Sequence, residues 1–575
     1  MQVRFDDLVT GESLALVEPL RTIEAAKPAE VLSAIAEAEA AAREGHHVAG
    51  FVCYEAAPAF DSALVTRRPP DLPLVWFGVF GGVEPAPPRQ PAWYEVGALV
   101  PTIERPRYEQ DLAAIRSLIR IGDTYQVNHT FRMRAAFDGS PAGLYDDLCR
   151  TQQTPYAAFL DIGDLAVASA SPELFFASSG RRIVTRPMKG TARRGRWSAE
   201  DSEQRHRLIH SEKQQAENVM IVDLLRNDLG RVAEFGSVRV DELFTAERYQ
   251  TLWQLTSTIS GVAAPNTSLV DVFTALFPCG SVTGAPKPRT MEIISQRETT
   301  PRGVYTGAIG LIRPNGDARF SVGIRTVVIR SGVAEYGVGS GITWDSSSAD
   351  EYEEALLKAK VLTERHPDFD LIETMRYEPG IGIDLVDRHL ARIRESAEYF
   401  GFDLPADLGE KLDAFSADRP CRIKLTLTRR GRFSIEQGDL PPPADGVTAA
   451  VATDDPVNPD DRYLFHKTSR REVYERRRRL YPDQTDVILV NTRGEVTEST
   501  IANVAVLIEG HWYTPPLESG CLPGIRRGLL IEQGRLTERV MTVPELRAAE
   551  QIALVSSLRG RRAADLVESL STKRV

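Results

Sequence analysis

The chain has 575 residues, of which 42% are hydrophobic and 26% charged, the proportions of a globular protein with several buried cores. Its 69 basic and 80 acidic residues leave a net charge of −11, which argues against nucleic-acid binding through overall charge. No apolar run approaches the roughly 18 residues of a membrane span, and the opening MQVRFDDL lacks the hydrophobic core of a secretion signal. We therefore expect a cytoplasmic protein of several domains that binds neither nucleic acid nor membranes.

The first elements follow from local composition. Residues 31–43 are rich in Ala, Glu and Leu and predict a helix that Gly45 can end, and the strand-like HVAGFVCYE follows. Residues 108–362 alternate β-rich and helical runs without a repeat. This alternation predicts a large mixed α and β domain.

A domain boundary is expected near residues 364–370, where a helical segment stops at polar residues and Pro367. The first domain then spans residues 1–365 and the second 370–575. Three prolines within residues 438–446 disfavour both helix and central strand. The second domain is therefore expected to have two lobes.

Acidic side chains border two predicted helices of the first domain. In ADEYEEALLKAKVL an apolar stripe starts at Tyr352, and Glu354 and Lys358 lie beside it. Glu217 directly precedes the apolar run 219–222. Two such carboxylates and a ligand carboxylate would suit Mg²⁺, which takes few protein ligands and several waters. Ordinary solvated helix glutamates are the alternative that spacing alone leaves open.

Small residues mark two further candidate binding loops. FPCGSVTGAPKPRT holds Thr283 before a predicted helix near Pro288, and YGVGSGITWD has three alternate glycines from Gly337. RFSVGIRT places Arg325 on a predicted strand, as a possible bidentate partner of a carboxylate. Taken singly, a plain turn and a surface ion pair explain these features equally well.

Lys189 in TRPMKGTARRG lies between Met188 and Gly190, a setting that could desolvate its ammonium group. At a pKa of about 10.4 fewer than roughly one lysine in a thousand is neutral at pH 7. A nucleophilic lysine therefore needs a lowered pKa. A structural salt bridge is the alternative.

Together these motifs resemble a known family. SPELFF, RPMKGT, AENVMIVDLLRNDLGRV, GSVTGAPKPRT, YTGAIG, FSVGIRT, GVGSGIT and DEYEEALLKAK occur in the order found in the chorismate-utilising enzymes, over residues 1 to about 365. The family includes anthranilate, isochorismate, salicylate and aminodeoxychorismate synthases. The resemblance implies an α+β fold, a large antiparallel α/β sandwich that binds chorismate with Mg²⁺.

The resemblance also implies roles for individual residues. Glu217 and Glu354 would bind Mg²⁺ on the ring carboxylate of chorismate. The substrate would be held by Thr283, Tyr305, Arg325 and Gly339, with Lys358 nearby. In the aminodeoxychorismate synthase branch the lysine matching Lys189 adds to C2 of the ring, and the glutamate matching Glu173 is the general acid and base. Because anthranilate synthases typically carry Ala at the lysine position, Lys189 favours 4-amino-4-deoxychorismate as product.

Three positions depart from the family pattern. Met188 replaces the usual Ile, a modest change of similar volume. Gln254 stands where anthranilate synthases have a histidine, and Gln214 where several relatives have an acid. The roles of that histidine and that acid are therefore not transferred.

The second domain offers a lysine and a carboxylate of the kind that pyridoxal phosphate requires. Lys467 lies in LFHKTSRREVYERR, and Glu498 ends the second strand of a hairpin predicted around Asn491–Gly494. Arg388 and Arg392 are spaced i, i+4 on a predicted helix and could bind phosphate, although solvated helix arginines fit as well.

The order of motifs again resembles a family. FDLIETMR, VDRHLARI, FHKTSRR, EVTESTIANV, PPLESGCLPGIRRGLL and ALVSSLRG are similar to the fold-type IV pyridoxal phosphate enzymes, which include aminotransferases and 4-amino-4-deoxychorismate lyase. The match implies that Lys467 binds the cofactor and moves protons, and that Glu498 keeps its pyridine nitrogen protonated. The phosphate would be bound by Arg392, Ile525, Arg526 and Ser556 or Ser557. The family's opening hairpin is missing before FDLIETMR, or is donated by the first domain.

The two resemblances predict two consecutive steps of one pathway. We expect chorismate and ammonia to give 4-amino-4-deoxychorismate, from which the second domain removes pyruvate to give 4-aminobenzoate, a folate precursor. No cysteine-centred glutaminase motif is present, so a separate glutamine amidotransferase subunit is expected to supply ammonia. A homodimer through the second domain is possible.

Two alternatives remain at this point. One is an anthranilate-type synthase joined to a class IV aminotransferase, which Lys189 disfavours. The other is a non-catalytic regulatory protein that binds chorismate, which the retained acids and both lysines disfavour.

Overall fold

The computed structural model describes residues 1–67, 71–363, 368–442 and 447–567. The chain forms two compact units. The first contains Met1–Arg193 and Arg205–His366, and the second contains Arg194–Gln204 and Pro367–Val575. The second unit therefore includes eleven residues from within the predicted first domain. Parts of the predicted boundary and of the predicted lobe break, residues 364–367 and 443–446, lie outside the described residues.

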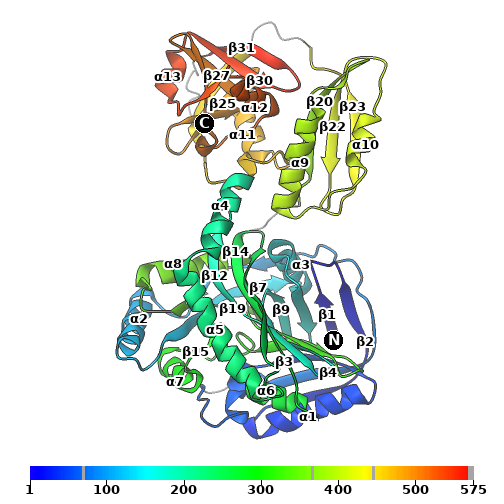
Figure 1. Cartoon of the computed structure of the whole chain (residues 1–575), viewed down its shortest axis with the longest axis vertical. Coiled ribbons are helices and arrows are strands. Elements are labelled where there is room, and N and C mark those ends of the chain that lie inside the picture. Colours follow the sequence, from blue (N-terminus) through cyan, green and yellow to red (C-terminus); the bar gives the residue numbers. More distant parts are fainter. Residues whose placement is uncertain (68–70, 364–367, 443–446, 568–575) are drawn as a thin grey trace. The chain divides into compact units, whose positions relative to one another are not determined.

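The first unit is built on one continuous sheet whose neighbouring strands are all antiparallel (Figure 1). Along it follow β7 (Gln126–Gly139), β19 (Val333–Ile342), β18 (Thr326–Arg330), β9 (Leu165–Ser171), β8 (Tyr156–Asp161), β1 (Gln2–Asp6), β2 (Ser13–Ala25), β4 (Val75–Pro85), β3 (His47–Val52), β16 (Ala308–Ile312), β17 (Ala318–Val322), β10 (Leu174–Ser179), β11 (Arg182–Arg186) and β14 (Leu252–Val262). β12 (Met188–Arg193) and β13 (Arg239–Arg248) both pair with β14, and the short β5 (Tyr94–Val96), β6 (Val100–Pro101) and β15 (Gly284–Ala285) pair with β7.

Helices cover two regions of this sheet. A third region has a core that is formed mainly by strands. The helices are α1 (Pro28–Arg43), α2 (Arg105–Arg120), α3 (Pro141–Gln152), α4 (Ser198–Ile209), α5 (Glu212–Gly230), α6 (Leu269–Leu276), α7 (Lys287–Arg297) and α8 (Ser348–Ala359). One core lies under α1, α5 and α6, and another under α2, α3 and α8. A third core draws most of its side chains from strands, including β1, β4 and β16. This layering confirms the predicted α+β sandwich.

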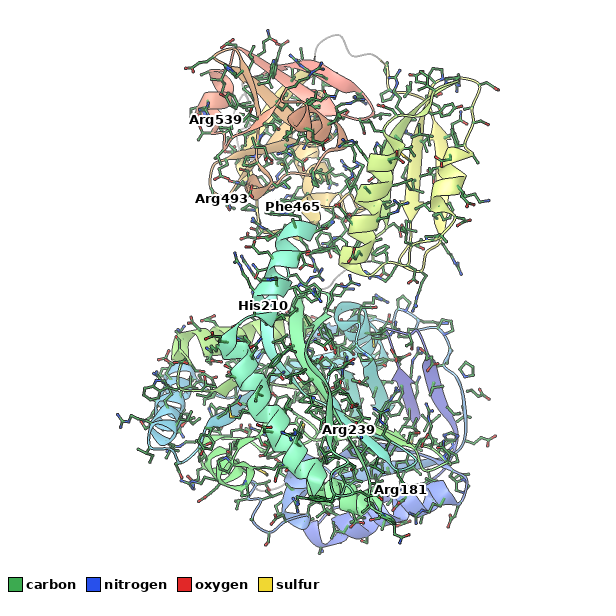
Figure 2. All side chains as sticks on the ribbon, in the orientation of Figure 1. Arg181, His210, Arg239, Phe465, Arg493 and Arg539 are labelled. Atoms are coloured by element: carbon green, nitrogen blue, oxygen red, sulfur yellow. The ribbon has the colours of Figure 1, made fainter. Side chains whose placement is uncertain are left out.

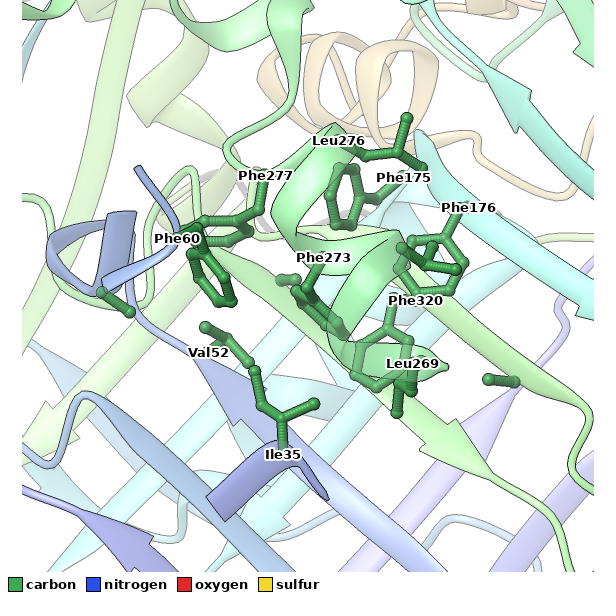
Figure 3. Packing of buried hydrophobic residues seen from close by; sticks show 14 of the residues in the cluster. Ile35, Val52, Phe60, Phe175, Phe176, Leu269, Phe273, Leu276, Phe277 and Phe320 are labelled. Atoms are coloured by element: carbon green, nitrogen blue, oxygen red, sulfur yellow. The ribbon is translucent and has the colours of Figure 1, made fainter. Parts of the chain in front are cut away.

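A cluster of phenylalanines fixes the strand that follows Glu173. Phe175 and Phe176 of β10 pack on Phe273 of α6, with ring centroids 6.0 and 5.4 Å apart. Phe320 of β17 lies 5.1 Å from Phe273, and Phe60 completes the packing (Figure 3). Because this apolar cluster is fully buried, it holds the start of β10 rigidly.

The second unit has two separate sheets, as two predicted lobes require. The first joins β21 (Gly382–Ile383), β20 (Leu371–Glu378), β22 (Cys421–Leu427) and β23 (Phe433–Gly438). α9 (Val386–Phe400) packs on β20, and α10 (Leu408–Asp413) contributes to the same core (Figure 1).

The second lobe is a closed ring of strands with two more strands added. β25 (Asp486–Asn491), β24 (Val447–Val457), β31 (Gly560–Leu566), β30 (Gln551–Ser556), β27 (Asn503–Ile508) and β26 (Val496–Ser499) pair in a circle, while β28 (His511–Thr514) and β29 (Thr537–Glu538) extend from β27. Its helices are α11 (Glu472–Leu480), α12 (Ile525–Glu532) and α13 (Val543–Arg547).

Local predictions agree with these elements. The predicted helix at 31–43 is α1, with Gly45 in a left-handed conformation just beyond it, and the hairpin around Asn491–Gly494 joins β25 and β26. Two predictions were wrong in detail. Arg325 lies in a bend between β17 and β18 with φ of 49°, not on a strand, and the glycines from Gly337 lie within strand β19, not in a loop. In the described parts of the chain, no helix is long and apolar enough to cross a membrane.

Candidate active sites

Lys189 lies on a bulge at the edge of the first unit's sheet. Met188 pairs with Thr256 and Thr191 with Gln254, so the pairing slips by one residue between them. Gly190 takes a φ of +96°, which favours glycine, and an added Cβ there would lie 3.1 Å from the Gln214 side chain. The bulge therefore turns Lys189 out of the regular alternation of the strand.

Neighbouring strands leave a space for the Lys189 amine. A Cβ at Gly341 of β19 would lie 3.1 Å from Lys189 Nζ and 2.2 Å from Gln126 Nε2. At the bulge, Asn218 Nδ2 of α5 donates to the Lys189 carbonyl at 3.3 Å, and Ser257 Oγ donates to Asn218 Oδ1 at 2.6 Å. These hydrogen bonds fix the main chain of Lys189. Its amine extends to Gly341, which has no side chain.

The surroundings of Lys189 favour its uncharged form. Burial lowers the pKa of Lys189, and the ammonium of Lys358 lowers it further, while Glu173 and Glu217 oppose the shift. A lowered pKa is the property that a nucleophilic lysine needs at neutral pH.

Glu173 lies beside Lys189 and is the best placed acid and base of this site. It is 2% exposed, and burial raises its pKa to about 7, against the influence of Ser281 and Lys189. Its Oε1 has no hydrogen-bond partner within the described residues. A carboxyl group with a pKa near 7 and a free oxygen can both give and take a proton at neutral pH.

Glu217 and Glu354 come from α5 and α8 and lie near one another. Burial raises the pKa of Glu217, Lys189 and Lys213 lower it, and Glu351 and Glu354 raise it again. Glu354 accepts from Lys358 Nζ at 2.8 Å. The described residues contain no ready-made group of three metal-binding side chains. A repelling set of carboxylates nevertheless suits Mg²⁺, which takes few protein ligands and adds substrate and water oxygens.

Tyr305 is held flat against the sheet. A Cβ at Gly337 would lie 2.2 Å from Tyr305 Cγ, so the strand needs glycine where the ring packs. The Arg132 guanidinium lies 4.8 Å from the ring centroid. Arg302 supports this region through Glu298, which it pairs with at 2.6 Å.

Arg325 is a cation with no acidic partner in the described structure. It donates to Gln152 Oε1 and lies 5.4 Å from the Tyr249 ring. Burial lowers its pKa, although a guanidinium remains charged. It is therefore suited to binding a substrate carboxylate.

Thr283 and Gly339 contribute mainly through the backbone. Thr283 is fully buried, its Oγ1 bonds to the Cys279 and Gly280 carbonyls, and its own carbonyl accepts from Asn128 N at 2.8 Å. The Gly339 carbonyl accepts from Lys358 Nζ at 3.0 Å. Neither residue offers a free side-chain donor.

In the second unit, Lys467 lies among charges of both signs. Burial, together with Arg392 and Arg471, lowers its pKa to about 8, although Glu373 and Glu498 oppose the shift. Its carbonyl accepts from Ile372 N at 2.9 Å, which ties it to the start of β20. A lysine with this pKa is partly neutral near pH 7, as reaction with an aldehyde requires.

Glu498 is a buried carboxyl group on β26. Tyr474 Oη donates to its Oε1 at 2.8 Å, and Asn503 Nδ2 lies 3.5 Å from its Oε2. Burial raises the pKa of Glu498 to about 7, although Tyr474 and Lys467 favour the charged form. A cationic partner such as a protonated pyridine nitrogen would restore its charge.

Arg392 is already paired in this structure. Its Nε and Nη2 donate to Glu373 at 2.8 and 2.6 Å, and its Nη1 to the Pro523 carbonyl at 3.2 Å. His389 Nδ1 lies 2.7 Å from the same carboxylate. Despite burial, Arg392 and His389 lower the pKa of Glu373 to about 2. These bonds hold the Arg392 side chain in place against Glu373 and the Pro523 carbonyl.

The other predicted phosphate ligands lie at the N-terminus of α12 and near β30. Gly524 precedes α12, and a Cβ there would lie 1.8 Å from Asn503 Oδ1. The first N–H groups of a helix have no partner within it and favour anions, which suits Ile525 and Arg526. The Arg526 side chain pairs with Asp384 at 2.5 Å, and Ser556 Oγ accepts from Arg559 N at 3.2 Å.

Several residues of these sites were missed from the sequence: Gln126, Asn218, Glu373, His389, Tyr474 and Asn503. Asn218 lies within the quoted motif AENVMIVDLLRNDLGRV, directly after Glu217. Tyr474 had no local signal, because its partner Glu498 is 24 residues away.

Comparison with known proteins finds a family model that matches each part of the chain. Residues 82–364 match the family described as chorismate binding enzyme, and residues 370–565 match amino-transferase class IV. The resemblance drawn from the motifs is thus confirmed for both parts.

Individual relatives match the first part. Aminodeoxychorismate synthase component 1 of Bacillus subtilis is 41% identical over 252 residues, 44% of this chain and 54% of that protein. Aminodeoxychorismate synthase of Streptomyces griseus is 43% identical over 307 residues, 53% of this chain and 42% of that protein. The chain therefore spans about half the length of these curated relatives. The crystal structure of anthranilate synthase component I from Streptococcus pneumoniae matches with a TM-score of 0.54 and 26% identity, covering 61% of this chain and 92% of that one.

Proposed function

We propose that this chain, a chorismate-binding domain followed by a class IV amino-transferase domain, makes 4-aminobenzoate from chorismate in two steps. The first step would replace the ring hydroxyl of chorismate by ammonia, giving 4-amino-4-deoxychorismate and water. The second would split this intermediate into 4-aminobenzoate and pyruvate. The observation that carries the proposal is Lys189, a lysine of lowered pKa beside the buried Glu173.

In the first step the Lys189 amine would add to C2 of the ring as the ring hydroxyl leaves as water. Ammonia would then add at the carbon that bore the hydroxyl, and the bond from Lys189 to C2 would break. Its lowered pKa makes the neutral amine available, and Asn218 keeps its main chain in place. Glu173, with a pKa of about 7, would give a proton to the departing hydroxyl and take one back later. Arg325 would bind a carboxylate of the substrate.

Mg²⁺ would be held by Glu217 and Glu354. When bound, it would neutralise the ring carboxylate of chorismate and offset the repulsion between these two acids. Lys358, now paired with Glu354, would then be released toward the substrate. These assignments are supported by the shared location of the acids and by the match to the chorismate binding enzymes.

Ammonia would come from a separate glutamine amidotransferase subunit. Relatives named component 1 support this, since the name implies a further component. Turnover with glutamine alone, without ammonium or added protein, would contradict it.

In the second step Lys467 would bind pyridoxal phosphate and move the proton at the ring carbon that bears the amine. When bound, this cofactor supplies an electron sink for the elimination. Glu498, oriented by Tyr474, would hold its pyridine nitrogen, and the N-terminus of α12 would hold its phosphate. Glu498 is buried and forms no salt bridge with any residue that the structure describes, which supports this arrangement.

The test is to incubate the purified chain with chorismate, ammonium, Mg²⁺ and pyridoxal phosphate. The products are then separated by chromatography and identified by mass spectrometry, because 4-aminobenzoate and anthranilate have equal mass. We expect 4-aminobenzoate and pyruvate in equal amounts. Anthranilate, or no aromatic product, would contradict the proposal.

A further inference from the structure

The segment Arg194–Gln204 follows the strand that carries Lys189, but it packs within the second unit. The chain leaves the first unit after Arg193 and returns to it at Arg205. Most of the segment is the first half of α4 and the turn before it. Its side chains pack into the rest of the second unit, as the contacts of Arg194 and Trp197 show.

Arg194 anchors the segment to α9. Its Nε and Nη2 pair with Asp201 at 2.7 Å each, and Nη2 also donates to the Tyr399 carbonyl at 2.9 Å. The Arg194 guanidinium lies 4.2 Å from the Tyr399 ring centroid, and Tyr399 Oη donates to the Gly195 carbonyl at 2.6 Å. Arg194 is only 8% exposed, so these bonds are shielded from water.

Trp197 packs on the loop that leads to Lys467. The centroids of the Trp197 and Phe465 rings lie 5.1 Å apart, and Phe465 is labelled in Figure 2. Trp197 joins a core cluster that also contains Tyr474. Arg196 adds a bond from its Nη1 to the Pro459 carbonyl at 3.3 Å.

These contacts reach both candidate cofactor residues, Lys467 through Phe465 and His466, and Glu498 through Tyr474. Phe465 and His466 directly precede Lys467. The His466 ring is tilted against the Tyr399 ring that Arg194 covers, with ring centroids 4.3 Å apart. Tyr474, in the Trp197 cluster, donates to Glu498. The segment thus supports both the loop of Lys467 and the partner of Glu498.

We propose that Arg194–Gln204 is a positioning element of the pyridoxal phosphate site, which holds Lys467 through Phe465 and His466, and Glu498 through Tyr474. This inference rests on the proposed function of the second domain. The second domain would then depend on a stretch of sequence that lies between Lys189 and Glu217.

The test uses the full chain with Trp197→Ala, which removes the ring packed on Phe465, and Trp197→Phe, which retains an aromatic ring. Trp93→Ala, at a tryptophan that is 64% exposed in the first unit, is the matched control. Pyridoxal phosphate is titrated by its visible absorption, and the pH midpoint of the bound cofactor's absorption change is measured at saturation. We expect Trp197→Ala to bind about tenfold more weakly, the size of effect that supporting residues have in metal sites, and to shift the midpoint. Trp197→Phe should recover most of both properties.

A second variant keeps the inference testable should Trp197→Ala fail to fold. Tyr399→Phe removes only the hydroxyl that donates to Gly195, and we expect about fivefold weaker binding with the fold intact. Wild-type affinity and midpoint in both Trp197→Ala and Tyr399→Phe would overturn the positioning role. Absence of any cofactor absorption in the unaltered chain would instead refute the proposed function of the second domain, and the inference with it.

Discussion

Replacing Gly341 by alanine tests the geometry of the Lys189 site. The added Cβ would lie 2.2 Å from Gln126 Nε2 and 3.1 Å from Lys189 Nζ, whereas ordinary contacts begin at 3.4 Å. Gln126 would have to retreat by more than 1 Å, and Lys189 by a few tenths. Since a misplacement of about 1 Å at a reacting group can cost about a hundredfold in rate, we expect a loss of that order in the first step.

The assay measures chorismate consumption with ammonium and Mg²⁺. Gly230→Ala is the matched control, because a Cβ at Gly230 of α5 would meet nothing within 4 Å. Elimination of pyruvate from supplied 4-amino-4-deoxychorismate should continue in both variants. Chorismate consumption by Gly341→Ala within about threefold of the unaltered chain would refute the proposed place of the Lys189 amine.

Three further predictions address the metal, the cofactor lysine and its neighbours. Removal of Mg²⁺ by a chelator should stop chorismate consumption and leave pyruvate elimination unchanged, and loss of both activities would argue against a metal confined to Glu217 and Glu354. The pKa of Lys467 is lowered to about 8, so its amine is charged below that pH and neutral above it. The rate at which the cofactor-free chain captures pyridoxal phosphate should therefore rise from pH 7 to 9, and Arg471→Gln should move the midpoint upward by removing a positive charge; a flat profile would contradict this. Tyr474→Phe removes the 2.8 Å bond to Glu498, and at about 1.4 kcal/mol it should slow elimination roughly tenfold, whereas an unchanged rate would show that the bond plays no part.

Local sequence patterns predicted the elements but not the contacts between them. The helix at 31–43 and the hairpin around Asn491–Gly494 were predictable because helix-forming residues and turn glycines act within a few positions. Arg325 was misread because a left-handed bend depends on the strands at either side, and the pattern around it is that of a strand.

The candidate sites came mainly from the resemblance to known families. Composition and spacing alone left Glu217, Glu354 and Lys189 open to plain structural explanations. The approach of Lys189 to Gly341 spans 152 positions and arises from strand pairing, which no local pattern encodes. The inclusion of Arg194–Gln204 in the second unit is a further long-range contact, and only the suspected loss of the opening hairpin hinted at it.

The most direct test of the account compares Lys189→Ala with Lys467→Ala in the full chain. Lys189→Ala should abolish formation of 4-amino-4-deoxychorismate from chorismate and ammonium, yet still release pyruvate from supplied intermediate. Lys467→Ala should do the reverse and accumulate the intermediate. Loss of both half-reactions in either folded variant would contradict two active sites that each depend on one lysine.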